Sequence, residues 1–334
     1  MSTRHTLAAI LFVFAVMTFS AGARAQGRWV VGRVGGAQGG RNYKLWLPAG
    51  YSMKRRLPLV MMLHGCTQTP EDFAAGTRMN SLADKHSFLV VYPEQPQEAN
   101  PLKCWNWFAP EHQSRDKGEP ALLADVVRAV QSSHRTDARR VYVAGISAGG
   151  AMAVILGAAY PDLFAAVGVS AGLEYKAAAS IPEALAAQKQ GGPDPVRQGR
   201  LAYEAMRSVP GFAARRGLMP VIVFQGSDDG AVAPANAEQV AAQWVATNDL
   251  LDDGAGNGSV DYVRHGAAAG SGVGLHDYEV NIYRDRRGRP LVERWLVKGL
   301  RHAWSGGSAD GTFTDPKGPD ASAEMWRFFS GFKR

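Results

Sequence analysis

The chain has 334 residues, 46% of them hydrophobic and 20% charged, which is enough for one large α/β domain with a substantial core. Its formal net charge of +7 is spread along the sequence. The densest basic run, residues 284–289, lies between two strand-like segments, which favours a solvated hairpin turn over a nucleic-acid surface. From composition and charge we therefore expect no nucleic-acid partner.

The N-terminal 25 residues have the pattern of a secretory signal peptide. A short basic start precedes an apolar stretch over residues 7–19, and Ala23-Arg24-Ala25 forms a small-x-small cleavage site. The apolar stretch is shorter than the roughly 20 residues that a membrane-spanning helix needs. We therefore expect residues 1–25 to be removed, the protein to be secreted to the periplasm or outside the cell, and no membrane partner.

Residues 26–334 are expected to form a single catalytic domain, because no Pro/Thr/Ser-rich linker divides them. Strand-like and helix-like segments alternate along this region, as a mostly parallel sheet requires. Residues 43–47 alternate like an edge strand, whereas residues 248–274, rich in Gly, Asp and Asn, predict a loop. Residues 173–215 form a segment that is longer than a simple crossover helix. The sequence does not decide whether this segment forms a lid over the site. The remaining predicted strands are 57–63, 88–92, 141–144, 166–170, 220–224 and 292–297, and the predicted helices are 71–85 and 122–133.

Gly145-Ile146-Ser147-Ala148-Gly149 is a G-x-S-x-G box placed between a predicted strand and a small-residue helix. This is the context in which a serine becomes an exposed nucleophile on a strained turn. Glycines at both ends of the box remove Cβ atoms that would collide as the strand and the helix approach. The box predicts a serine hydrolase with Ser147 as its nucleophile.

A serine hydroxyl needs a histidine to take its proton and a carboxylate to orient that histidine. His302 is far downstream and follows the predicted strand 292–297, as the order Ser, Asp, His requires. The acid is expected just after the strand 220–224, where Asp228 and Asp229 are adjacent. The local sequence does not choose between the two aspartates, and the other one is expected to cap a turn.

Ester hydrolysis also needs N–H donors for the oxyanion, and the N–H groups of Cys66 and Ala148 fit that role. In an exported protein Cys66 and Cys104 can pair, which the chain-entropy model values at roughly 4 kcal/mol. The alternatives are two free thiols, or Cys66 as the nucleophile of a cysteine enzyme, which the box around Ser147 disfavours. No motif for a metal, a nucleotide or another cofactor is present.

Four segments together resemble the secreted polyhydroxybutyrate depolymerase esterases, a branch that also includes feruloyl and acetylxylan esterases. They are the HGCTQ sequence at 64–68, CWNW at 104–107, GISAGGAM at 145–152 and HAWSGG at 302–307, and the tail 310–321 is also similar. The resemblance covers nearly all of residues 26–334. It implies an α/β-hydrolase fold and an ester substrate.

The resemblance also assigns roles that the local sequence leaves open. It implies Asp229 as the acid, because the family's Gly-x-x-Asp-x-x-Val pattern begins at Gly226, and it implies a bridge between Cys66 and Cys104. Gln225 departs from the family, which commonly has His there, and we expect the triad to stay intact. We expect no separate substrate-binding domain of the kind that other enzymes of the family carry for adsorption to polyester.

Two substrate classes remain after the resemblance. The first is poly(3-hydroxybutyrate)-type polyester or its oligomers, and the second is the feruloyl or acetyl esters of plant cell walls. A catalytically silent binding protein is a third reading, disfavoured because every triad component is present. Trp105, Trp107 and Trp304 are expected to shape an apolar substrate cleft, although each can equally be a core residue. The oligomeric state is left open.

Overall fold

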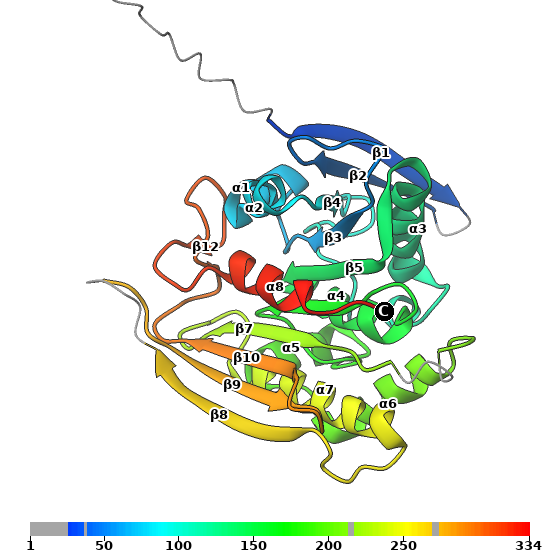
Figure 1. Cartoon of the computed structure of the whole chain (residues 1–334). Helices are drawn as coiled ribbons and strands as arrows, with labels where there is room; N and C mark the ends of the chain where they lie inside the picture. The colour runs from blue at the N-terminus through cyan, green and yellow to red at the C-terminus, as the bar shows by residue number, and fades with distance from the viewer. Residues whose placement is uncertain (1–25, 37–38, 213–216, 269–273) are drawn as a thin grey trace, which may run out of the picture.

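The structure is a computed structural model that describes residues 26–36, 39–212, 217–268 and 274–334. The predicted signal peptide at 1–25 lies outside the described residues. The described residues form a ten-stranded sheet with helices on both faces, and a separate two-stranded sheet (Figure 1). Among these residues, no helix combines the length and the apolar character needed to cross a membrane.

The ten strands follow the order β1-β2-β4-β3-β5-β6-β7-β10-β9-β8 across the large sheet. The six central strands from β4 to β10 are mutually parallel, and antiparallel pairs flank them on both sides. This confirms the mostly parallel sheet that the sequence predicted. The strands are β1 (Arg28–Gly36), β2 (Gly39–Leu47), β3 (Leu57–Leu63), β4 (Leu89–Pro93), β5 (Thr136–Ile146), β6 (Ala166–Ser170), β7 (Val221–Gly226), β8 (Asp261–Ala268), β9 (Tyr278–Arg284) and β10 (Pro290–Val297), with β11 (Trp304–Ser305) and β12 (Thr314–Asp315) in the small sheet.

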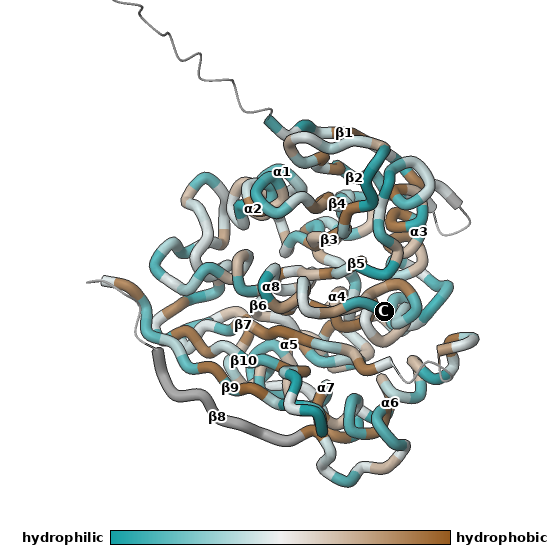
Figure 2. The backbone as a smooth tube through the Cα atoms, viewed as in Figure 1, coloured by the Kyte–Doolittle hydropathy of each residue, from teal (hydrophilic) through white to brown (hydrophobic). Residues whose placement is uncertain are grey.

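Along the central strands β3, β4, β5 and β7, successive apolar residues belong alternately to two hydrophobic cores on opposite faces of the sheet. In β3, Leu59, Met61 and Leu63 join the core that contains α3, α4 and α7, whereas Val60 and Met62 join the core that contains α1, α2 and α8. Strands buried on both faces read as continuous apolar runs, which explains why they were evident in the sequence. Figure 2 shows hydrophobic residues gathered on the central strands. The helices are α1 (Pro70–Thr77), α2 (Met79–His86), α3 (Gly118–Ser133), α4 (Ala148–Ala159), α5 (Ile181–Gln190), α6 (Pro195–Arg207), α7 (Ala235–Asp253) and α8 (Ala321–Ser330), with a 3₁₀ turn at Pro110–His112.

Two predictions about the outer strands and their connections were wrong. Residues 43–47 belong to β2, which lies between β1 and β4 and is not an edge strand. The segment 248–274 is not one loop, because α7 continues to Asp253 and residues 261–268 form β8. The errors that concern strands have one cause. These strands are stabilised by pairing with distant partners, and a local composition rich in glycine does not reveal such pairing.

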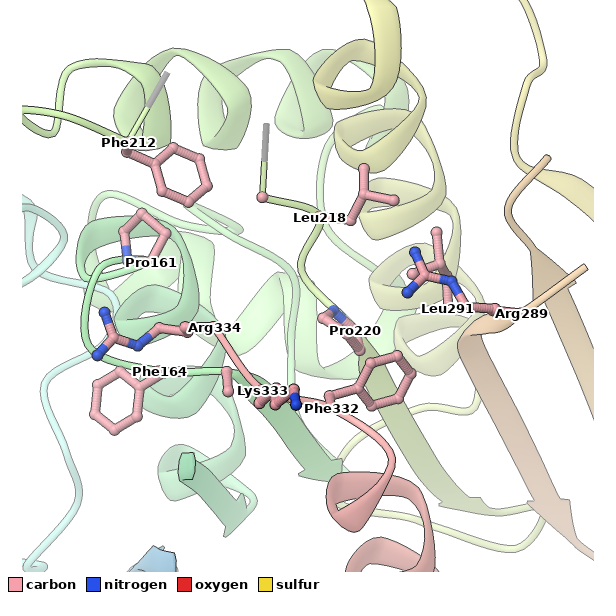
Figure 3. A pocket seen from close by; sticks show the side chains of 12 residues that line it. Pro161, Phe164, Phe212, Leu218, Pro220, Arg289, Leu291, Phe332, Lys333 and Arg334 are labelled. Atoms are coloured by element: carbon pink, nitrogen blue, oxygen red, sulfur yellow. The ribbon is translucent and has the colours of Figure 1, made fainter. Parts of the chain in front are cut away.

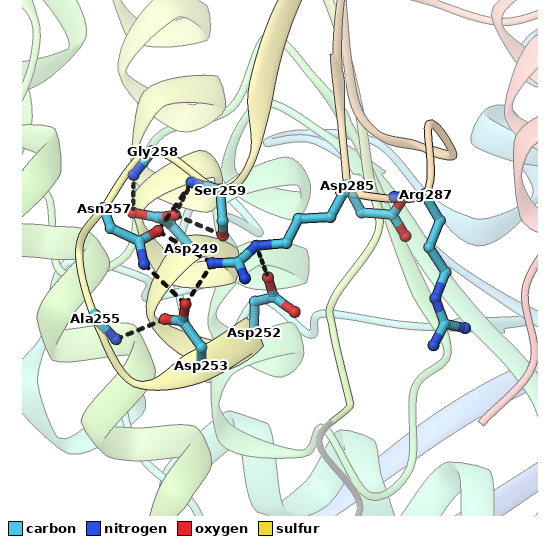
Figure 4. A network of polar contacts seen from close by, with 10 residues as sticks. Asp249, Asp252, Asp253, Ala255, Asn257, Gly258, Ser259, Asp285 and Arg287 are labelled. Carbon is cyan, nitrogen blue, oxygen red and sulfur yellow. Dashed lines mark hydrogen bonds and ion pairs between the residues drawn. The ribbon is translucent and has the colours of Figure 1, made fainter.

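The basic run at 284–289 is the turn between the antiparallel strands β9 and β10, as predicted. Two of its arginines pair with nearby acids. Arg286 pairs with Asp252 at 3.0 Å and with Asp253, two acids at the end of α7 (Figure 4). Arg289 pairs with Asp285 at 2.7 Å. This local neutralisation supports the interpretation of the run as a hairpin turn.

The long segment after β6 forms part of the fold's helical layer. Its described part, residues 173–212, contains α5 and α6, and α6 packs along α7. Ala184, Ala187 and Ala202 are buried within the core. This part of the segment therefore packs against the body of the protein.

Candidate active site

Ser147 occupies a sharp turn between the end of β5 and the start of α4, with φ of 57° and ψ of −124°. A Cβ atom on Gly149 would lie 2.2 Å from the carbonyl oxygen of Leu63, and one on Gly145 would lie 2.4 Å from the backbone of Gly149. No side chain fits at either position without displacing backbone. The two glycines thus permit the close approach that projects Ser147 beyond the sheet.

Ser147 lines a pocket of about 210 Å³ together with Cys66, Ala231, His302 and Phe313. These residues come from five separate connections between elements. Parallel strands bring the segments that follow them to one edge of the sheet, which is where ligands bind in open α/β folds. The structure therefore brings together the predicted nucleophile, the predicted base and one predicted oxyanion residue.

The imidazole of His302 is paired with a buried carboxylate. His302 Nδ1 lies 2.7 Å from Asp229 Oδ2, and the Asp229 side chain has no exposed surface. Asp228 instead is exposed and accepts a hydrogen bond from Ser227 Oγ at 2.7 Å. The geometry thus separates two aspartates that the local sequence left equivalent.

Asp229 accepts hydrogen bonds on both carboxylate oxygens. The N–H groups of Ala231 and Val232 donate to Oδ1 at 2.9 and 2.8 Å, and Gln225 Nε2 donates to Oδ2 at 3.1 Å. Burial raises the pKa of Asp229, but the hydrogen bond and charge of His302 and the two backbone donors outweigh burial and lower the pKa below its usual value. Gln225, the departure from the family pattern, is therefore a donor to the acid.

The loop that carries Cys66 is fixed from several sides. Cys66 and Cys104 form a disulfide with an S–S length of 2.05 Å, which confirms that prediction. Gly65 N donates to Gln68 Oε1 at 2.9 Å, and Trp105 Nε1 donates to the carbonyl of His64 at 3.0 Å. Ala148, the other predicted oxyanion donor, is the first residue of α4, where N–H groups have no acceptor within the helix.

His64 is a structural residue within this loop. Burial lowers the pKa of His64 to about 4, so the ring is neutral at physiological pH. Its Nε2 accepts from Gln95 N at 3.1 Å, which assigns the proton to Nδ1, and Nδ1 donates to the Gly65 carbonyl at 2.8 Å. The imidazole therefore braces the backbone directly before Cys66.

The prediction that three tryptophans shape the cleft was wrong. Trp105 and Trp304 have no exposed surface and Trp107 is 3% exposed. Burial of a large ring is favourable when its N–H finds a partner, as Trp304 Nε1 does with Ser322 Oγ at 3.0 Å. These rings support the loops from behind, and the aromatic residue that faces the pocket is Phe313.

Three residues of the site were missed in the sequence. Phe313 lines the pocket, while Gln68 and Asp72 hydrogen-bond to Thr312, the residue before it. The tail around Phe313 stood out only as part of the family resemblance. Gln68 precedes the N-cap of α1 and Asp72 lies in its first turn, where Gln68 Nε2 donates to Asp72 Oδ2 at 2.9 Å, but no local signal identifies Thr312 as their partner.

A second hollow, of about 260 Å³, lies at the other end of the strands (Figure 3). Its wall includes Pro220, directly before β7, and Leu291 at the start of β10, with Phe164 and Arg289. Ser147, Asp229 and His302 all follow the carboxyl ends of their strands. This hollow is therefore separate from the place where the candidate catalytic side chains meet.

A central parallel sheet with a serine on a strand-to-helix turn defines the α/β-hydrolase class of folds. Within that class, the chain belongs to the family described as esterase PHB depolymerase, whose model matches residues 41–265. The match includes Ser147 and Asp229. It confirms both the resemblance and the fold expected from the sequence.

Similarity to individual proteins supports this family assignment. Poly(3-hydroxyalkanoate) depolymerase C of Paucimonas lemoignei is 33% identical over 258 residues, which is 77% of this chain and 56% of the relative. Feruloyl esterase B of Thermothelomyces thermophilus is 29% identical over 61% of this chain and 69% of its own length. The chain thus spans little more than half of the depolymerase. Among solved structures, an acetyl xylan esterase from Aspergillus awamori has the same fold, with a TM-score of 0.68 at 18% identity over 90% of this chain and 99% of its own.

Proposed function

We propose that this protein is a secreted serine esterase that hydrolyses poly(3-hydroxybutyrate)-type polyester or its oligomers. One observation carries the proposal. Ser147, at a strained strand-to-helix turn, shares a pocket with His302, whose Nδ1 is 2.7 Å from the buried Asp229 carboxylate. That arrangement supplies a nucleophile, a base and an orienting acid in one place.

The residues act in two half-reactions. Ser147 Oγ attacks the ester carbonyl carbon while His302 Nε2 takes the hydroxyl proton, and the carbon–oxygen bond to the alcohol breaks as Nε2 returns the proton to that oxygen. Water then attacks the acyl-enzyme by the same route and releases the acid. Asp229 accepts from Nδ1–H, which keeps Nε2 free as the base and stabilises the imidazolium.

The N–H groups of Cys66 and Ala148 are proposed as the oxyanion hole. Each loss of such a donor typically costs about 2.7 to 4 kcal/mol of transition-state stabilisation, so the donors must be held rigidly. The disulfide to Cys104 and the brace from His64 support that requirement on the Cys66 side. The start of α4 supports it on the Ala148 side.

We also propose that residues 1–25 are a signal peptide and that residues 26–334 are one catalytic domain. The leader's apolar stretch and small-x-small site support export, and a disulfide is consistent with an oxidising compartment. N-terminal sequencing of the exported protein tests this, with Gln26 expected as the first residue. An N-terminus at Met1 on the exported protein would contradict it.

A second candidate is hydrolysis of cell-wall esters, favoured by the similarity to a feruloyl esterase and by further relatives named acetylxylan esterases. The catalytic residues would be the same, and only the substrate would differ. The depolymerase relative has the higher identity over a longer stretch of this chain, which is why polyester is placed first.

The deciding experiment measures products released from amorphous poly(3-hydroxybutyrate), methyl ferulate and acetylxylan by the purified mature protein. Ser147→Ala is the matched control. Serine-dependent release of hydroxybutyrate products supports the first proposal, and release of ferulate or acetate alone moves the substrate to the cell wall. Hydrolysis that persists in Ser147→Ala would contradict the assignment of the nucleophile.

A further inference from the structure

Phe313 presents an aromatic ring to the pocket of Ser147. Its side chain is 46% exposed, although it is one of the largest apolar side chains, and it lines the same pocket as Ser147 and His302. The rings of Phe313 and His302 meet edge to face, with centroids 6.2 Å apart. Contact between this exposed ring and an apolar group of the substrate would remove the surface of both from water, which favours binding.

The backbone of Phe313 is strained. Its φ of 51° lies in the left-handed region, which is disfavoured for any residue with a Cβ and uncommon for a bulky one. A glycine would relieve the strain at this position. Strained positions of this kind persist only where the surrounding structure enforces them, and they cluster at functional sites.

The Phe313 carbonyl accepts a hydrogen bond from Trp304 N at 2.7 Å, and further contacts of the neighbouring residue Thr312 connect this segment to the loop that carries Cys66. Thr312 N donates to Asp72 Oδ1 at 2.9 Å, and Gln68 Nε2 donates to the Thr312 carbonyl at 3.0 Å. The same Gln68 accepts from Gly65 N, directly before Cys66. The aromatic wall and the predicted oxyanion donor are therefore positioned by one shared side chain.

We propose that Phe313 is a specificity-determining residue that packs against the alcohol portion of the ester, an inference that rests on the proposed function. The leaving alcohol oxygen must come within hydrogen-bond reach of His302 to receive its proton. The carbonyl oxygen, by contrast, must lie at the N–H donors on the other side of the scissile bond. Because the Phe313 ring lies against His302, it contacts the alcohol side and selects apolar alcohols.

The test compares esters that share an acyl group and differ in the alcohol: methyl, butyl and benzyl butyrate, followed by titration of the released acid. All three pass through one acyl-enzyme, so differences in kcat/KM report acylation, where the alcohol is still bound. The variants are Phe313→Gly and Phe313→Leu. Lys176→Gly is the matched control, since Lys176 is exposed, has a φ of 54° and does not line the pocket.

We expect Phe313→Gly to lose roughly 10- to 100-fold in kcat/KM for the butyl and benzyl esters, the range of a lost apolar contact, and less than about 3-fold for the methyl ester. Its melting temperature should equal or exceed that of the wild type, because glycine relieves the backbone strain. Phe313→Leu should keep part of the preference, and Lys176→Gly all of it.

An equal loss for all three esters, or no loss for any, would overturn the inference. If Phe313→Gly does not fold, Phe313→Leu decides, and an unchanged butyl-to-methyl ratio in that variant overturns the inference as well. Labelling of Ser147 by a fluorophosphonate in every variant separates the two proposals. A wild-type protein that neither labels nor hydrolyses any ester contradicts the proposed function itself.

Discussion

Two buried carboxyl groups follow neighbouring parallel strands, and their surroundings are opposite. Asp229, after β7, accepts four hydrogen bonds, and its pKa is lowered. Glu174, after β6, is 2% exposed, and neither carboxyl oxygen has a hydrogen-bond partner among the described residues. Burial, and then the charge of Asp194, raise the pKa of Glu174 from 4.5 to about 8.

The comparison shows that burial alone makes a carboxyl group neutral, whereas burial with donors keeps it charged. Asp229 can therefore hold the imidazolium of His302 at neutral pH. Glu174 remains protonated there and has no contact with the pocket of Ser147. Both carboxyl groups are buried, so the hydrogen-bond donors are what distinguish Asp229, which stays charged beside His302, from Glu174, whose burial lowers the stability of the fold.

The largest effect is expected from Asp229→Asn, with a loss in kcat on the order of 10⁴. The amide can donate to Nδ1 and thereby favours the wrong tautomer of His302. Steady-state kinetics with a soluble butyrate ester measures the loss, and the melting temperature checks that the fold is retained. A variant within tenfold of the wild type would show that Asp229 is not the orienting acid.

Glu174→Gln is expected to stabilise the protein at alkaline pH. The unfolded chain releases this proton near pH 4.5 and the native protein near 8, so native stability falls as pH rises between these values. Removing the group should raise the free energy of unfolding by on the order of 3 kcal/mol at pH 7.5, and by little at pH 4.5. Urea unfolding at both pH values measures this. An equal effect at both would contradict the raised pKa, and activity should stay within about twofold.

Gln225→Leu tests whether a side-chain donor is part of what keeps Asp229 charged. A hydrogen bond to a charged group contributes about 1.5 to 3 kcal/mol, so we expect a loss of roughly 10- to 150-fold in kcat/KM. The pKa of Asp229 should rise when the donor is lost. On acidification, the variant should therefore lose activity at a higher pH than the wild type does. Gln225→His, with a ring N–H donor, should restore most of the activity. An unchanged pH profile in Gln225→Leu would show that Gln225 does not influence the pKa of Asp229 and contributes only to packing.

The smallest effect is expected from Asp228→Asn, because this exposed side chain bonds to Ser227 and not to His302. We expect kcat/KM within about twofold of the wild type, as is usual for exposed positions away from a site. If this substitution proved more damaging than Asp229→Asn, the two aspartates would exchange roles.

Much of the site could be predicted because its signals are local and steric. The glycines at 145 and 149 indicate that a strand and a helix approach more closely than any side chain would permit. The sharp turn that carries Ser147 could therefore be predicted. His302 was indicated by its place after the last central strand. Asp229 required the family pattern, since adjacent residues on a bend are chemically alike until the fold orients one of them toward the imidazole.

The errors share a different physical cause. Trp105 and Trp304 are large enough for a cleft or a core, and their burial depends on hydrogen-bond partners such as His64 and Ser322, which are distant in the sequence. The β8 and β1 strands likewise depend on pairing with β9 and β2. Composition in a short window does not contain these contacts.

The sequence by itself determined the mostly parallel sheet and indicated Ser147 and His302 as the candidate nucleophile and base, because apolar runs, glycine sterics and chain order act over short distances. The family pattern indicated Asp229, and the tertiary structure brings it to His302. Only the tertiary structure decided which aromatic residue faces the pocket and which buried carboxyl group keeps its charge. Those outcomes depend on where loops from separate strands converge, and on how many donors each buried group finds there.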